Sequence, residues 1–304
     1  MKSSQKISVI YLLGAGHSGS TLLDLIMGSH SQIFGAGELQ QYFVSPDSRI
    51  RSCMCGKTVL ECPFWKKVFK NLNLESGLTV YRKRKDFLLN RKSYLDSYYR
   101  CPVNLEKYIE LNEELYKNIL KYSGKKIVFD SSKWPYRAEL LLNSNKLDIT
   151  ILHLVRNGKG VTWSWRACWD NRSRHSNVIR RIRVMYHWLA CNLQIEIVKR
   201  RNRANYIFLR YEDFVKNPKG ILKLILKKLG LSFEPQMMSF RNENNHQVAG
   251  NLKLKRKLAT NQEIKIKEDI GWKEDMPLIY RITFDLLFGW LNIYYKFKKS
   301  VYGK

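Results

Sequence analysis

The chain has 304 residues, which is enough for one large α/β domain or for two smaller domains. Hydrophobic residues make up 44% of it, with 17 Tyr, 13 Phe and 8 Trp, and this content excludes a wholly disordered chain. The 54 Lys and Arg residues outnumber the 26 Asp and Glu residues, so the formal net charge is +28. Such a charge favours anionic partners: nucleotides, acidic glycans, nucleic acid or an anionic membrane.

The first elements are a strand, a glycine-rich loop and a helix. The continuous apolar run Ile7–Leu13 predicts a strand buried on both faces of a parallel sheet. Glycines follow, and Thr21–Met27 has the apolar spacing of a helix. A short strand within Phe34–Tyr42 is expected to return to the sheet, so the order is that of a βαβ unit.

Residues from about 45 to 105 differ from the rest of the chain, because they contain a cysteine cluster, the basic run Tyr81–Lys85 and many tyrosines. We interpret this segment as a partly helical insertion that covers the substrate side. Helical periodicity follows over Leu105–Tyr122, and buried strands are predicted at Lys126–Asp130 and Asp148–Val155.

The second half of the chain predicts four more elements. They are a helix at Ile179–Lys199, a strand at Asn205–Arg210, an amphipathic helix at Pro218–Leu229 and a C-terminal helix at about 277–298. Strands that alternate with helices predict a doubly wound parallel sheet flanked by helices, in a single domain over residues 1–304. Ligands of such sheets bind at the carboxyl ends of the strands.

The sequence contains no pattern of a secretory signal or of a membrane span. The segment Met1–Lys6 is polar, and the apolar run after it is too short for a signal core. The most apolar later segment, Phe284–Phe297, is interrupted by Asp285 and Asn292, which indicates a buried or interfacial helix. We therefore expect a cytoplasmic protein, with peripheral membrane contact as an additional prediction.

The loop Gly14–Thr21, which reads GAGHSGST, follows the first strand and begins the first helix. Glycines let backbone N–H groups turn inward, and the helix N-terminus adds its dipole, so the loop predicts an anion site. Its spacing is that of the Walker A loop without the lysine, because Ser20 stands at the lysine position. A triphosphate would be poorly neutralised there, whereas one phosphate and one sulfate need less charge.

The segment GAGHSGSTLL resembles the 5′-phosphosulfate loop of the sulfotransferases, which use 3′-phosphoadenosine 5′-phosphosulfate (PAPS). The resemblance implies a P-loop-containing nucleotide-hydrolase-like fold. It also implies that the donor is bound by Gly14, Gly16, His17, Ser18, Gly19, Ser20 and Thr21. Family members often carry Arg or Lys at the position of His17, and His17 can still donate to the sulfonate as a catalytic group.

A second segment, LVRNGKGVTWSW, places Arg156 at a strand end and Ser164 eight residues later. The arginine offers a planar, permanently charged fork for phosphate, and the serine reaches the same anion if the helix packs alongside. The pair resembles the family's 3′-phosphate site, which distinguishes PAPS from ATP.

Two further positions resemble the catalytic groups of the family. Lys133 follows the strand that ends at Asp130, and a cation there would stabilise charge on the oxygen that bridges phosphate and sulfur. Glu38 lies 21 residues beyond His17, a distance that matches the general base of the tyrosylprotein and some carbohydrate sulfotransferases. Asp130 could instead hold magnesium as a Walker B acid, which keeps a nucleotidase as an alternative.

Two later segments complete the resemblance. Tyr211, in Arg210-Tyr211-Glu212-Asp213, matches the tyrosine that the family places at the adenine. The basic loop from Gly250 and Asn251 to Arg256 resembles the loop that closes over the 3′-phosphate, with Lys253, Lys255 and Arg256 as alternatives for that contact.

Three of the six cysteines, Cys53, Cys55 and Cys62, lie close together in the sequence. A zinc site usually takes four ligands, and no fourth Cys or His lies near them in the sequence, so packing or a local disulfide is favoured over metal. No metal cofactor is expected. The cluster with the following Pro63-Phe64-Trp65 resembles a feature of the bacterial branch of the family.

The sequence thus predicts transfer of a sulfonate group from PAPS, with PAP as product, to a hydroxyl or amine by in-line displacement. The acceptor is expected to be a carbohydrate, glycolipid or small molecule, and no specific nucleic-acid partner is expected. A P-loop kinase or nucleotidase acting on ATP and a non-catalytic nucleic-acid-binding protein remain the alternatives.

Overall fold

The computed structural model describes most of the chain. The described residues are 6–41, 52–72, 105–165, 177–201, 205–239, 245–251, 254, 257 and 266–301. Most of the predicted insertion, including the basic run at 81–85, lies outside them.

The five strands form one sheet in the order β2-β3-β1-β4-β5. They are β1 (Ile7–Leu13), β2 (Ile33–Gly37), β3 (Ile127–Lys133), β4 (Leu147–Val155) and β5 (Tyr206–Arg210). The pairs β2–β3 and β4–β5 are parallel. The predicted α/β fold with a parallel sheet flanked by helices is therefore confirmed.

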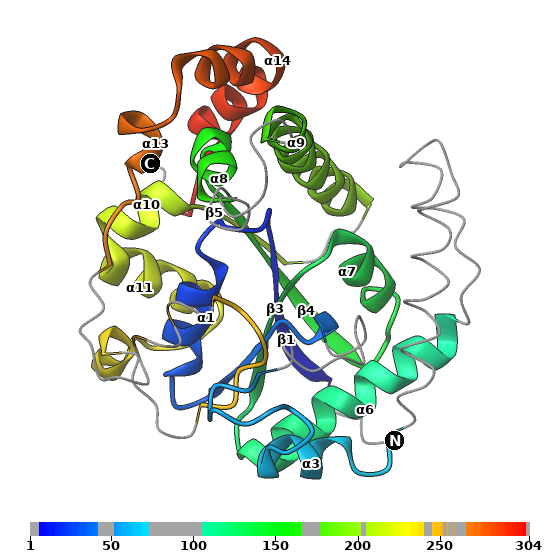
Figure 1. The fold of residues 1–304 in the computed structure, drawn as a ribbon. Helices are drawn as coiled ribbons and strands as arrows, with labels where there is room; N and C mark the ends of the chain where they lie inside the picture. Colours follow the sequence, from blue (N-terminus) through cyan, green and yellow to red (C-terminus); the bar gives the residue numbers. More distant parts are fainter. Residues whose placement is uncertain are drawn as a thin grey trace. The chain divides into compact units, whose positions relative to one another are not determined.

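The helices follow the predicted order (Figure 1). They are α1 (Ser20–Gly28), α3 (Pro63–Phe69), α6 (Leu105–Ser123), α7 (Pro135–Leu141), α8 (Gly158–Ser164), α9 (Asn177–Arg201), α10 (Tyr211–Lys216), α11 (Pro218–Lys228), α13 (Gly271–Glu274) and α14 (Leu278–Phe297), with a 3₁₀ turn at Pro235–Met238. Each boundary of the long predicted helices agrees within about two residues.

The strand β3 is longer than predicted. The sequence indicated an end at Asp130, because Ser131 and Ser132 are polar, but the strand continues to Lys133 with Asp130, Ser131 and Ser132 buried. Hydrogen bonds satisfy part of this buried polar surface: the Ser132 N–H donates to Asp130 Oδ1 at 2.9 Å, and Gln40 N–H donates to Ser132 Oγ at 3.1 Å.

Contacts group the chain into two compact units. Unit 1 comprises Met1–Tyr11, Thr21–Thr150 and Glu234–Asn261, and unit 2 comprises Leu12–Ser20, Ile151–Phe233 and Gln262–Lys304. The single domain over residues 1–304 remains a prediction. Each unit has its own buried apolar side chains: Trp65 and Phe129 are fully buried in unit 1, and Trp188 and Phe284 in unit 2.

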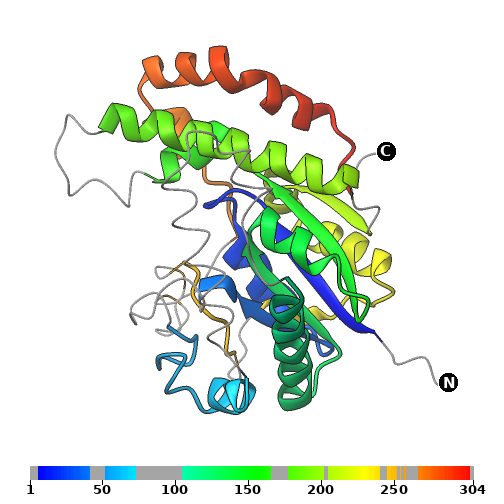
Figure 2. The same ribbon diagram turned by 90° about the vertical axis from the view of Figure 1, so that its right-hand side faces the viewer.

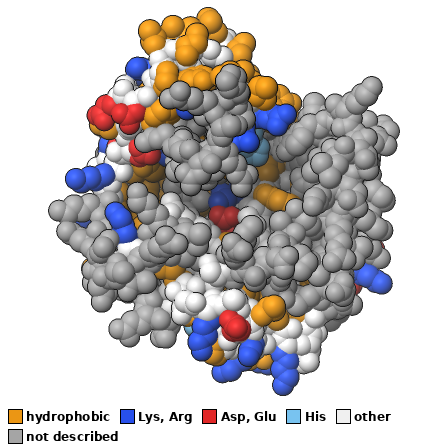
Figure 3. Space-filling view, viewed as in Figure 1, with side chains coloured by type: hydrophobic (Ala, Val, Ile, Leu, Met, Phe, Trp, Pro, Cys, Tyr) orange, Lys and Arg blue, Asp and Glu red, His pale blue; other side chains and the backbone are white. Residues whose placement is uncertain are grey.

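In unit 2, α14 lies along α9 (Figure 2), where Tyr295 Oη donates to the Asn192 carbonyl at 3.4 Å. One side of α14 is buried through Phe284, Phe288 and Leu291. Its other side carries exposed apolar side chains, visible as the orange region at the top of Figure 3. These are Leu278, Ile279, Ile282, Leu286, Leu287, Trp290, Ile293, Tyr294 and Phe297.

None of the helices within the described residues combines the length and apolarity that crossing a bilayer requires. The segment Phe284–Phe297 lies within α14 and buries Phe284, Phe288 and Leu291.

The fully buried Asp24 on α1 predicts an unusual pH dependence of stability. Burial raises the pKa of this carboxyl to about 7, although hydrogen bonds from Ser131, Gln247 and Gly37 oppose the shift. In the unfolded chain the group ionises near pH ~4. Between these values the folded protein holds a proton that the unfolded chain has lost, so stability falls as pH rises through this window.

We expect Asp24→Asn to remove this dependence, because the amide oxygen can still accept from the Gly37 N–H, which donates to Asp24 Oδ2 at 3.1 Å. Urea unfolding at pH 5 and pH 8 measures the effect. The variant should gain stability over the wild type by a few kcal/mol more at pH 8 than at pH 5. An equal difference at both pH values would contradict the prediction.

Candidate functional site

The glycine loop lies in unit 2 up to Ser20, between β1 and α1. Gly19 has φ +92°, and a Cβ there would lie 2.8 Å from a ring carbon of Tyr211, so only glycine fits. His17 also has a left-handed backbone, with φ +63°, which is uncommon for a residue with a side chain. The loop is therefore held in a tight curl at the start of α1, as the sequence predicted.

The hydroxyl of Ser18 is a buried polar group within the glycine loop. Ser18 is 1% exposed, and its Oγ has no hydrogen-bond partner among the described residues. A buried hydroxyl without a partner costs free energy, which an anionic oxygen in the loop would recover. This polar group fits the phosphosulfate that the loop is predicted to bind.

Arg156 follows β4 and is almost completely buried. Its Nη1 donates to the His17 carbonyl at 2.9 Å, and its Nη2 donates to Asp269 Oδ2 at 2.9 Å. The guanidinium also lies over the Tyr211 ring, 4.7 Å from the centroid. Asp269 was not among the predicted site residues, because it lies outside the predicted helices and strands and belongs to none of the recognised motifs.

Ser164, the last residue of α8, lies beside the glycine loop. Its Oγ is 3.1 Å from His17 Nδ1, and the His17 ring lies against Trp165, with centroids 4.5 Å apart. Asn157 caps α8, because its side chain accepts from the Lys159 N–H at 3.0 Å. Ser164 and Arg156 thus each contact His17, through its ring and its carbonyl, and their binding of one anion stays a prediction.

Tyr211 begins α10 directly after β5. Burial raises the pKa of its hydroxyl, although the Arg156 charge partly opposes the rise. The neutral hydroxyl accepts from the Asp269 N–H at 3.4 Å. Tyr211 therefore packs against the loop through Gly19 and against Arg156, and its role at the adenine stays a prediction.

In unit 1, Glu38 and Lys133 form an ion pair between Oε1 and Nζ, with each side chain largely buried. Lys133 has φ +67°, a strained backbone for a lysine. Gly37 precedes Glu38 with φ +78°, and a Cβ there would lie 2.1 Å from the Val248 carbonyl oxygen. The sequence singled out both Glu38 and Lys133 but not their contact.

The loop at Gly250 and Asn251 approaches the beginning of α1 within unit 1. The Asn251 N–H donates to Thr21 Oγ1 at 3.1 Å, so two predicted binding residues meet. Lys253 and the alternatives Lys255 and Arg256 lie outside the described residues.

Asp130 is fully buried in unit 1, and both of its carboxylate oxygens accept hydrogen bonds. Its Oδ2 accepts from Arg137 Nη1 and from Tyr116 Oη, both at 2.7 Å, and its Oδ1 accepts from the Ser132 N–H. A carboxylate with both oxygens bonded inside the protein is poorly suited to hold magnesium, which disfavours the Walker B interpretation.

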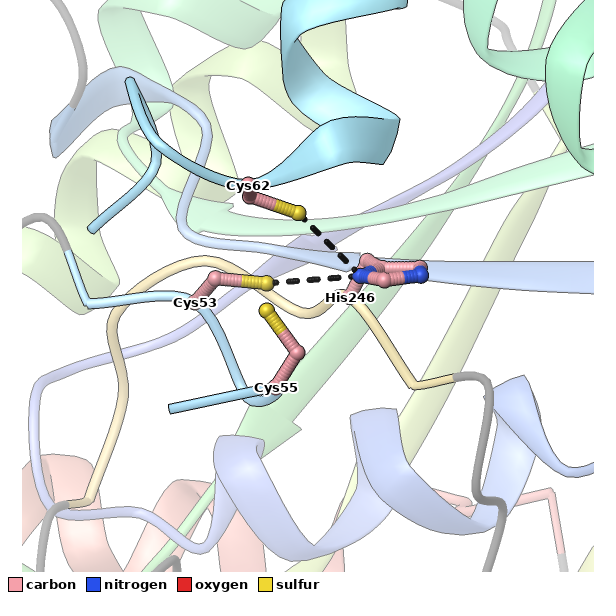
Figure 4. A group of neighbouring side chains, drawn as sticks. All are labelled: Cys53, Cys55, Cys62 and His246. Atoms are coloured by element: carbon pink, nitrogen blue, oxygen red, sulfur yellow. Dashed lines mark hydrogen bonds between the residues drawn. The ribbon is translucent and has the colours of Figure 1, made fainter. Parts of the chain in front are cut away.

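Cys53, Cys55 and Cys62 are thiols that converge with His246 (Figure 4). The sequence offers no fourth ligand near the three cysteines along the chain. His246, 184 residues beyond Cys62, supplies that side chain, and burial lowers its pKa so that the ring is neutral at neutral pH. The spacing of the residues in the sequence does not predict the contact between His246 and the cysteines.

Comparison with known proteins identifies a family for this chain. The model of the sulfotransferase family matches residues 9–235, which is more than half of the chain. A comparison with curated proteins finds no match.

Three solved structures share the fold. The sulfotransferase domain of the Synechococcus PCC 7002 olefin synthase is 17% identical, with a TM-score of 0.52 over 95% of this chain and 97% of that one. The sulfotransferase domain from the curacin biosynthetic pathway is 18% identical, with a TM-score of 0.51 over 93% and 98%. A sulfotransferase from Mycobacterium avium is 11% identical, with a TM-score of 0.53 over 99% and 79%.

The match of the family model, over a segment that contains the glycine loop and both Arg156 and Ser164, decides the classification. This chain belongs to the sulfotransferase family.

Proposed function

We propose that the protein transfers a sulfonate group from PAPS to a hydroxyl or amine of an acceptor. The observation that carries the proposal is the meeting of His17 with Arg156 and Ser164 beside the glycine loop. The loop offers N–H groups and the unpartnered Ser18 hydroxyl for one anion, and Arg156 offers a charged fork for another. Two anions of this kind match a donor with a 5′-phosphosulfate and a separate 3′-phosphate.

PAPS would supply an activated sulfur, and the residues of the chain would position it and balance charge. His17 and the loop would bind the phosphosulfate, and the Arg156–Ser164 pair would hold the 3′-phosphate. Arg156 already has Asp269 as a carboxylate partner, so a phosphate there would compete with that carboxylate for Nη2.

Glu38 and Lys133 support the acid–base part of the proposal. Glu38 would accept the proton of the attacking hydroxyl or amine, as a general base. A protonated Glu38 no longer attracts the Lys133 ammonium as an ion-pair partner. Proton transfer would therefore leave the Lys133 ammonium without a neutralising carboxylate while negative charge builds on the departing phosphate. A positive charge available at that moment stabilises the transition state.

The acceptor is proposed as a carbohydrate, glycolipid or small molecule. The basic and aromatic residues that support this choice lie in the insertion, outside the described part of the chain, so the acceptor class rests on the sequence alone.

Calorimetry separates this proposal from its alternatives. We expect the protein to bind PAP without magnesium, and to bind ATP more weakly with or without it, because the loop lacks the Walker lysine. Tight ATP binding with no PAP binding would contradict the proposal and favour a kinase or nucleotidase. Salt-sensitive binding to arbitrary DNA without PAP binding would favour a nucleic-acid-binding protein.

Glu38→Gln tests the proposed base. We expect turnover of labelled PAPS with fractionated extract of the source organism to fall at least about 100-fold, because no other group replaces the lost carboxylate, while PAP affinity stays unchanged. The matched control is Glu114→Gln, at a surface pair with Lys117 that contributes little. Unchanged turnover in Glu38→Gln would remove Glu38 as the base.

The exposed apolar side of α14 supports a second proposal, peripheral contact with an anionic membrane, because the chain is also strongly basic. The protein should sediment with vesicles that contain phosphatidylserine. Leu286→Gln, at a side chain that is 79% exposed, should weaken this binding, whereas Ile179→Gln on α9 should not. Equal binding of all three proteins, or none, would contradict the proposal.

A further inference from the structure

The cysteine cluster forms a compact group of four side chains in unit 1. The three Sγ atoms of Cys53, Cys55 and Cys62 and a ring nitrogen of His246 all lie within 4.8 Å of one another. His246 Nδ1 is 3.6 Å from the Cys53 sulfur and 3.3 Å from the Cys62 sulfur. Figure 4 shows the four side chains pointing toward a common centre.

The two distances from His246 Nδ1 to sulfur, 3.6 and 3.3 Å, are close to those of a metal site. With Zn–S bonds of about 2.3 Å and Zn–N bonds of about 2.0 Å, the ligand atoms of a tetrahedral site lie about 3.5–3.8 Å apart. Three soft thiolates and one imidazole favour zinc over the harder cations magnesium and calcium. Four protein ligands leave no open position, which is typical of a structural rather than a catalytic ion.

We propose that Cys53, Cys55, Cys62 and His246 bind one zinc ion in a closed, structural Cys₃His site. The ion would be structural and would take no part in the sulfonate-transfer steps proposed above.

The surrounding backbone already holds the ligands in place. The Cys53 N–H donates to the Lys57 carbonyl at 2.9 Å, which closes a tight turn that contains Cys55. Cys62 directly precedes α3, and its N–H donates to the Thr58 carbonyl at 2.9 Å.

The histidine is oriented by the beginning of α3. The His246 ring stacks on Phe64 with centroids 4.9 Å apart, and its carbonyl accepts from Trp65 Nε1 at 2.7 Å. A ligating histidine needs a fixed ring orientation, and these contacts outside the four ligands provide it.

The ion would also fix the segment 246–249 beside the proposed base. Val248, two residues after His246, accepts from the Glu38 N–H at 2.9 Å and donates to the Ala36 carbonyl at 3.0 Å. On its other side, the Met54 N–H donates to the Gln247 carbonyl and the Ala249 N–H donates to the Ser52 carbonyl. Zinc would therefore lock the segment 246–249 between the cysteine loop and the backbone of Glu38.

Metal analysis of the full chain, purified without a histidine tag, tests the proposal. We expect about one zinc per chain by mass spectrometry of the digested protein, and less than about a tenth of that in Cys55→Ser and in His246→Asn. Cys191→Ser, the same change at a buried thiol in α9, should keep the ion. A folded wild type without zinc, or unchanged zinc in both ligand variants, would overturn the proposal.

Cobalt gives a readout that does not depend on the folding of a variant. Wild-type protein reconstituted with Co²⁺ should show the visible bands of tetrahedral cobalt and a near-ultraviolet thiolate charge-transfer band. An octahedral cobalt spectrum, or a disulfide among the three cysteines in freshly purified protein, would overturn the proposal.

Amide hydrogen exchange tests the effect on the segment 246–249. Removal of zinc by a chelator should speed exchange at least about tenfold at the Glu38 and Val248 N–H groups, because local opening becomes easier. The α11 amides of unit 2 should keep their rates. Unchanged exchange at Glu38 and Val248 in zinc-free protein would refute the locking role, whatever the enzyme activity.

Discussion

The glycine loop of unit 2 depends on the buried guanidinium of Arg156. This group donates to the His17 carbonyl, pairs with Asp269 and lies over Tyr211, so it joins the loop, the segment before α13 and the start of α10. A planar fork with several donors can make these contacts at once, which a lysine ammonium cannot do with the same geometry. The same residue thus both shapes the loop and supplies the charge that the proposed donor needs.

Two residues with proposed roles have a positive backbone φ. His17 and Lys133 are two of the four described non-glycine residues with positive φ, and a third, Ala249, directly follows Val248. Such conformations persist only where surrounding contacts determine them. At His17 the Arg156 hydrogen bond does so, and beside Ala249 the paired backbones of Val248 and Glu38 do so.

The sequence predicted the fold well because the strands are apolar and the loop after β1 is rich in glycine. It also predicted that Arg156 and Ser164 bind one anion together; in the structure each contacts His17, and the shared anion stays a prediction. It did not predict that Glu38 pairs with Lys133, or that Arg156 pairs with Asp269, because nothing in local periodicity relates residues so far apart.

The contact of His246 with the cysteine cluster was also not predictable from local sequence patterns. Only three potential ligands, all cysteines, are neighbours in the sequence. The fold adds His246, because its segment is hydrogen-bonded to β2 and to the cysteine loop. The end of strand β3 was predicted too early for a different reason. Apolar patterning ends a strand at the first polar residues, whereas buried hydrogen bonds let these residues continue the strand.

The proposed function depends on recognition of the 3′-phosphate of a nucleotide by the site around Arg156. PAP and adenosine 5′-phosphate differ only in that group, so the affinities of the wild type and of Arg156→Ala for both nucleotides test the claim directly. The wild type should prefer PAP by about tenfold or more, as a charge-assisted contact implies, and the variant should lose that preference. Equal affinity of the wild type for the two nucleotides, or an undiminished preference in the variant, would contradict the claim.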